Sequence, residues 1–182
     1  RKPTRPACLT TCALRTATTA GGTPVTNDDD GAVHLSGRPA QETLRLALHT
    51  EATGLRMLRL DLLAGPDGRV GLAQNGNAVV SAIRVRASSS ADPKRGEEIP
   101  LDWAWADFEQ PNGDFDVLNA IRGDGDGWAL GGHLREGGRT ALLFCRDAFG
   151  FEGGTEVTVE ITCASRYQDH VIAGARVQFA RA

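Results

Sequence analysis

The stretch NAIRGDGDGWAL, residues 119–130, combines flexible backbone with oxygen-bearing groups more densely than any other part of the chain. Five candidate oxygen donors occur in it, namely the carboxylates of Asp124 and Asp126 and the backbone carbonyls of Asn119, Ala120 and Gly123. Calcium takes roughly six to eight oxygen ligands, often from such loops, and glycine lets the backbone wrap closely around an ion. The spacing excludes an EF-hand. The stretch therefore predicts a structural calcium site, a plain turn, or a direct ligand contact.

Two tryptophans stand two residues apart in LDWAWADF, residues 101–108. In an extended strand that spacing places Trp103 and Trp105 on the same face. Stacked indoles can form a sugar-binding platform, because the C–H-rich faces of sugars pack well on flat aromatic rings. The alternative is an ordinary strand that buries both indoles in the core or at its edge. Trp128, which closes a turn, is expected to be buried.

A further aromatic cluster occurs in SRYQDH, residues 165–170. Tyr167 offers an aromatic plane beside the hydrogen-bonding side chains of Arg166, Gln168 and His170. This mixture is typical of sugar sites, where a few polar groups fix the orientation of a ligand on an apolar surface. The alternative is a solvated hairpin loop, and the sequence leaves both interpretations open.

No catalytic constellation is recognisable. The four histidines are scattered, without the spacing of a metal site, and no serine has the G-x-S-x-G context of a nucleophile. No pair among the 23 acidic residues is marked out for glycosidase chemistry. Cys145 and Cys163 fall on apolar strand faces, which favours buried, inert thiols. We therefore predict a protein without catalytic activity of its own.

The elements that position these residues read as short strands. Alternation of apolar and polar residues, the mark of a half-buried strand, occurs in 42–50, 58–64, 79–87, 156–164 and 171–180. Glycine-rich turns connect the strands; in one of them, QNGN, Asn75 and Asn77 are expected to hydrogen-bond neighbouring loops rather than a ligand. Such a pattern favours an all-β fold, an antiparallel jelly-roll β-sandwich.

The alternation also predicts the core and the domain limits. The expected core residues are Leu44, Leu46, Leu60, Ile83, Val85, Val157, Val159, Ile161, Val177 and Phe179. Residues 1–25 carry little pattern and are interpreted as an N-terminal strap or tail, and 26–182 as a single sandwich domain. The polar stretch 87–98 is expected to form a long loop between the halves of the sandwich.

Composition narrows the class of protein. The chain has 182 residues, enough for one domain, and its net charge of −3 gives no footprint for nucleic acid. No apolar run approaches the ~20 residues of a membrane helix, so no membrane insertion is expected. Cys8 and Cys12 fit neither haem attachment nor a zinc knuckle, and a disulfide between them is possible if the protein is exported.

Four separated motifs carry a family resemblance: NGNAVVSAIRV (75–85), ADFEQ (106–110), NAIRGDGDGWAL and HVIAGARVQFA (170–180). Together they resemble the non-catalytic β-sandwich module of large exported planctomycete-type bacterial proteins that also carry cytochrome c-like domains. That module is in turn similar to galactose-binding-like, discoidin-type jelly rolls. In the resembling pattern an aspartate stands where this chain has Arg122, which cannot ligate a cation.

The resemblance implies a carbohydrate-binding module that tethers a larger exported protein, secreted, periplasmic or at the cell surface, to a glycan. It also implies a structural calcium ion, unless Arg122 substitutes for it. The alternative function is a structural or protein-interaction sandwich with no small-molecule ligand. Exposure of the aromatic residues separates the two, since a scaffold would bury them and a glycan site would present them in a groove.

Overall fold

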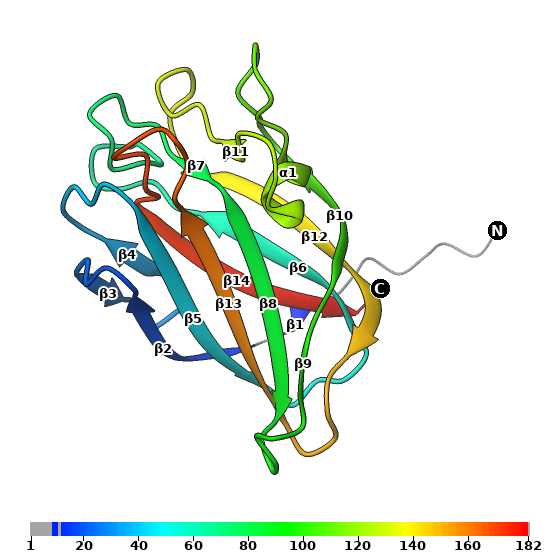
Figure 1. Ribbon diagram of the computed structural model, residues 1–182. Coiled ribbons are helices and arrows are strands. Elements are labelled where there is room, and N and C mark those ends of the chain that lie inside the picture. Colours follow the sequence, from blue (N-terminus) through cyan, green and yellow to red (C-terminus); the bar gives the residue numbers. More distant parts are fainter. Residues whose placement is uncertain (1–8, 11, 182) are drawn as a thin grey trace.

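The chain folds into two antiparallel sheets packed face to face (Figure 1). The computed structural model describes residues 9, 10 and 12–181. The seven-stranded sheet has the order β10 (Leu101–Ala106), β12 (Arg139–Phe149), β6 (Leu55–Leu62), β14 (Gly174–Arg181), β4 (Val33–Leu35), β3 (Val25–Asn27), and β1 (Leu9–Thr10) also pairs with β14. The five-stranded sheet has the order β2 (Ala13–Thr19), β5 (Glu42–Thr50), β13 (Thr155–Cys163), β8 (Ala82–Ser89), β9 (Gly96–Glu98). This confirms the predicted β-sandwich, with both sheets open; its jelly-roll topology stays a prediction.

The core follows the period of two along each strand. In β13, the central strand of its sheet, buried residues alternate with half-buried ones from end to end. Ile161 lies opposite Leu44 on β5 and Ile83 on β8, and Val159 repeats the arrangement one pleat further along. All ten predicted core residues are buried, so the alternation identified the inner faces correctly.

The N-terminal segment joins the two sheets. β1 pairs with β14 in one sheet, and β2 pairs with β5 in the other. Residues 13–19, which the sequence assigns to an N-terminal strap, are thus an integral edge strand. The buried Glu42 secures the segment that follows, because its carboxylate accepts hydrogen bonds from the backbone of Gly21 at 2.7 Å and of Thr23 at 3.2 Å.

One short helix and a small third sheet cover one end of the sandwich. α1 (Val117–Arg122) is capped by Asp116, which accepts from the amide of Leu118, and ends at Gly123 in the left-handed conformation. β11 (Trp128–Ala129) pairs with β7 (Val79–Val80). The predicted loop 87–98 is a hairpin, because β8 continues to Ser89 and β9 returns beside it.

Within the part of the chain that the structure describes, no helix is long and apolar enough to cross a membrane.

Candidate functional site

The loops at the end of the sandwich that carries α1 enclose a pocket of about 170 Å³. They follow β6, β10, β11 and β13, and they gather at the top of the molecule in Figure 1. The pocket is lined by Asn75, Asn77, Val79, Gln110, Phe115, Ala129, His133, Tyr167 and His170. Of the six ligand-binding residues predicted from the sequence, the pocket brings together Tyr167 and His170.

Tyr167 is held by a small apolar cluster beneath the pocket. Val79, Phe115 and Ala129 are buried together, and the half-buried Tyr167 packs against them. The rings of Tyr167 and Phe115 lie 6.1 Å apart at an angle of 57°, and the ring of His170 lies 5.9 Å from Tyr167. Tyr167, the aromatic residue singled out in SRYQDH, therefore lines the pocket and packs against a buried apolar cluster.

Arg166 fixes Tyr167 from the other side. Its guanidinium carbon lies 5.0 Å from the ring centroid, and its Nη2 donates to the phenol oxygen at 2.9 Å. The same nitrogen donates to Asp126 Oδ2 at 2.8 Å. Asp126, which belongs to the glycine-rich stretch 119–130, thereby positions Tyr167 through Arg166. Gln168 is exposed, and its contribution is the backbone carbonyl that accepts from His170.

The polar groups of the pocket leave donors and an acceptor available. Asn77 is committed to structure, since its Nδ2 donates to Gln110 Oε1 at 2.9 Å and its Oδ1 accepts from the amide of Gly132 at 3.1 Å. Asn75 Oδ1 accepts from the Asn77 amide at 3.0 Å. With both oxygens engaged, the Nδ2 of Asn75 and the Nε2 of Gln110 receive no hydrogen-bond partner from the described residues.

His170 supplies the acceptor. Its Nδ1 lies 2.7 Å from the carbonyl oxygen of Gln168. Because a carbonyl can only accept, Nδ1 carries the proton and Nε2 of the neutral ring keeps its lone pair. Two amide donors and one imidazole acceptor around an aromatic ring match vicinal hydroxyl groups, each of which both donates and accepts.

The five predicted calcium ligands do not all face one point. Asn119 and Ala120 lie in α1, and the carbonyl of Asn119 accepts from the amides of Gly123 and Asp124 in the helix cap. Asp124 is exposed, whereas Asp126 pairs with Arg166. Among the residues that the structure describes, no three metal-binding side chains gather into a site.

The structure gives Asp126 a charge partner that the sequence did not suggest, namely Arg166. Arg122, the expected substitute for the ion, is exposed and forms no ion pair with a described residue. A calcium ion in the loop stays a prediction that the placement of Asn119 does not favour. Trp128 is fully buried as expected, and its Nε1 donates to the carbonyl of Phe108 at 3.0 Å.

Trp103 and Trp105 lie elsewhere, on the outer face of the seven-stranded sheet. Their exposed fractions are 51% and 47%, whereas Ala104 between them points inward and is buried. The ring of Trp103 lies 5.2 Å from that of Phe144 on β12. Of the two interpretations left open by the sequence, burial in the core does not hold. Neither tryptophan lines the loop-end pocket.

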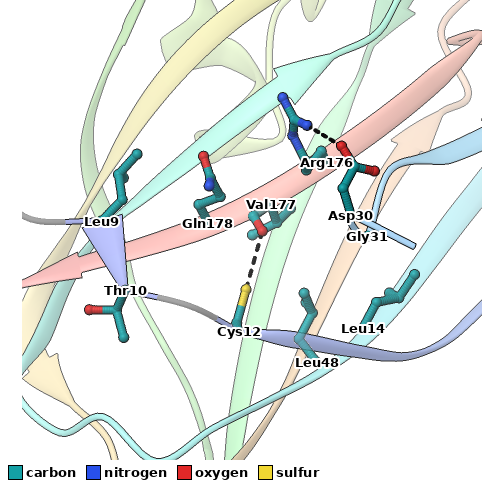
Figure 2. Close-up of a pocket in the computed structure, with 10 residues that line it drawn as sticks. All are labelled: Leu9, Thr10, Cys12, Leu14, Asp30, Gly31, Leu48, Arg176, Val177 and Gln178. Atoms are coloured by element: carbon teal, nitrogen blue, oxygen red, sulfur yellow. Dashed lines mark hydrogen bonds and ion pairs between the residues drawn. The ribbon is translucent and has the colours of Figure 1, made fainter. Parts of the chain in front are cut away.

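A second hollow of about 140 Å³ opens where the N-terminal segment crosses between the sheets (Figure 2). Two contacts cross it, since Cys12 Sγ donates to the Val177 carbonyl at 3.2 Å and Arg176 Nη1 donates to Asp30 at 2.7 Å, whereas the buried Nε of Arg176 has no hydrogen-bond partner among the described residues. Burial raises the pKa of the Cys12 thiol to about 11, which makes it a poor nucleophile. Its predicted partner, Cys8, lies outside the described residues.

The other cysteines are inert as predicted. Cys145 and Cys163 are buried, and burial raises the pKa of each to about 12.

Comparison with protein-family models, with curated proteins and with solved structures gave no match to this chain.

Proposed function

We propose that this protein is a carbohydrate-binding module in which the loop-end pocket holds one sugar unit. The observation that carries the proposal is the meeting of the Tyr167 ring with unengaged polar groups of Asn75, Gln110 and His170 in one pocket. A flat ring contacts the C–H face of a sugar, and the polar groups bind the hydroxyls at its rim. No Asp, Glu, Lys or Arg is among the residues that line the pocket, which favours an uncharged sugar.

The wider setting is proposed on the same basis. The position of the pocket among loops at one end of an antiparallel sandwich suits the galactose-binding-like jelly roll that the sequence motifs resemble. The module would then tether a larger exported bacterial protein, whose other domains carry its chemistry, to a glycan outside the cytoplasm.

A glycan array with the labelled protein tests the proposal, followed by calorimetric titration of the best soluble ligand. Tyr167→Ala should weaken binding about tenfold or more, because it removes the aromatic contact, a loss of about 1.4 kcal/mol or more. Gln110→Ala should weaken it a few-fold, as expected for one hydrogen bond of about 1 kcal/mol.

Arg45→Ala is the matched control, because this exposed residue lies on β5 in the other sheet, does not line the pocket, and forms a surface pair with Glu160. It should bind as the unaltered protein does. If no glycan binds, or if Tyr167→Ala binds equally well, the pocket is not a sugar site and a structural or protein-interaction sandwich becomes the better hypothesis.

A further inference from the structure

An apolar row crosses the outer face of the seven-stranded sheet. Register places Trp103 opposite Phe144, Phe144 opposite Met57, Met57 opposite Ala180, and Ala180 opposite Leu9. The row thus runs across β10, β12, β6, β14 and β1, perpendicular to the strands. Side chains that share a row on one face of a sheet are direct neighbours. Trp103 stands at one end of this row, on the edge strand, and Trp105 stands beside it at the end of the next row, opposite Leu142.

The outer face of the five-stranded sheet has the polar side chains expected of a solvent-exposed face. On the five-stranded sheet the corresponding row reads Thr18, Arg45, Glu160 and Arg84 across β2, β5, β13 and β8. Arg45 pairs with Glu160 at 2.6 Å. One outer face is therefore polar, as a solvated face should be, whereas the other presents tryptophans to solvent. The difference indicates that the seven-stranded face serves a contact.

The exposed apolar area is too small for a stable protein interface. An indole that is half exposed presents on the order of 100 Å², so Trp103 and Trp105 together offer roughly 200 Å². Phe144, Met57 and Leu142 beside them are already partly covered. A stable protein complex buries about 800 Å² on each partner. The Cα atoms of Trp103 and Trp105, two residues apart on one strand, are separated by about 7 Å, more than the width of one six-membered ring, so the pair suits consecutive units of a chain polymer.

The charges near the indoles are already neutralised. Arg146 contacts Asp102 at 2.9 Å, and Arg59, which lies across from Leu142, contacts Asp61 at 3.0 Å. Gln178 comes next to Arg59 in the same row and is an uncharged amide. Because Arg146 and Arg59 each have a carboxylate partner, neither adds an unpaired positive charge beside the indoles to attract an anionic polymer.

We propose that Trp103 and Trp105, backed by Phe144, form a platform for a neutral polysaccharide chain, such as a β-linked glucan on an insoluble particle. This inference rests on the proposed function and extends it, because the platform binds the polymer while the separate loop-end pocket binds a single sugar unit. The module then has two contacts with carbohydrate, and retention on a particle does not depend on the pocket.

Retention on insoluble cellulose and insoluble chitin tests the platform, with soluble polygalacturonate as an anionic polymer in affinity electrophoresis. The unaltered protein should be retained on at least one of the two solids and should migrate normally in polygalacturonate. The double variant Trp103→Ala with Trp105→Ala should lose about tenfold or more of its retention. Both residues are exposed, so its urea midpoint should match that of the unaltered protein.

Leu134→Ala is the matched control, because Leu134 is equally exposed, at 54%, but lies in the loop after β11. It should be retained normally, and so should Tyr167→Ala. The platform is wrong if the double variant is retained as well as the unaltered protein. It is also wrong if the unaltered protein is retarded in polygalacturonate and the double variant is not. In either case, binding of the unaltered protein to the glycan array would still support the proposed function. Concentration-dependent dimerisation abolished in the double variant would assign the face to a second copy instead. If the unaltered protein binds neither the glycan array nor either solid, the proposed function itself is wrong.

Discussion

His49 is the residue through which pH should act on stability. Its Nδ1 lies 2.7 Å from Glu156 and its Nε2 lies 2.8 Å from Glu51. Hydrogen bonds with Glu51, and then with Glu156, raise the pKa of His49 above the ordinary 6.5. The pKa of His49 is therefore higher in the folded state than in the unfolded state. The stability that His49 contributes is fully present below about pH 6.5 and is lost as the pH rises through the folded-state pKa.

We therefore expect the free energy of unfolding to fall as the pH rises from about 6 to 9, and His49→Gln to remove most of that slope. Urea unfolding at several pH values measures it. His133→Gln is the control, since His133 forms no ion pair with a described residue. An unchanged slope in His49→Gln would mean that other groups govern the pH dependence.

Single residues also mark where the sequence was informative and where it was not. Tyr167 and His170 could be proposed for a site because their types are suited to it and they are neighbours in the chain. The partnership of Asp126 with Arg166 could not, because the two are 40 positions apart and nothing local joins them. A charge partner that arrives by tertiary folding leaves no mark on sequence spacing.

Arg139 determines the conformation of an entire element, the loop between β11 and β12. Its buried guanidinium has no carboxylate partner among the described residues and donates instead to the backbone carbonyls of Leu130, Gly131, Arg135, Glu136, Gly137 and Gly138. It also lies over the Phe108 ring, 4.9 Å from the centroid. This loop carries His133 into the pocket, so the sequence analysis missed a positioning residue.

Arg139→Lys should destabilise the fold by about 3 kcal/mol or more, because a lysine cannot supply the planar fork and leaves buried carbonyls without donors. The midpoint of urea unfolding measures the loss. Arg135→Ala is the control from the same loop: its pair with Asp107 is partly exposed, so about 1 kcal/mol or less is expected. A loss as small for Arg139→Lys as for the control would show that the loop holds itself in shape.

A strand could be predicted from the sequence where one of its faces is buried and the other is polar. β5, β8 and β13 alternate cleanly, and β14 does so over residues 175–179, because a core lies on one side and solvent or half-buried groups on the other. β2 was not predicted because it is an edge strand with mostly exposed side chains. α1 was not predicted because six residues are too few to display a helical period, although Asp116 and Gly123 are ordinary helix-end residues.

At the scale of the whole molecule, the sequence predicted two packed sheets but not which strands are neighbours. Trp103 and Trp105 alternate with the buried Ala104 as a half-buried strand should, so the pattern alone fits either face. Their exposure follows from register, which directs Ala104 inward beside Leu143. That information comes from pairing across the sheet and is absent from any local window.

The N-terminal strands supply the last test, because they connect the two sheets. β2 pairs with β5 along most of its length, Leu14 and Ala17 pack against the core, and Glu42 secures the turn after it. A chain that begins at residue 26, the domain limit predicted from sequence, would expose the edge of β5 and deprive the carboxylate of Glu42 of its donors in Gly21 and Thr23. We expect it to be less stable, by about 3 kcal/mol or more, than a chain that begins at residue 9. The comparison of the two chains in urea isolates β1 and β2, and circular dichroism checks that both remain mainly β. Equal midpoints would restore residues 1–25 to the status of a dispensable strap.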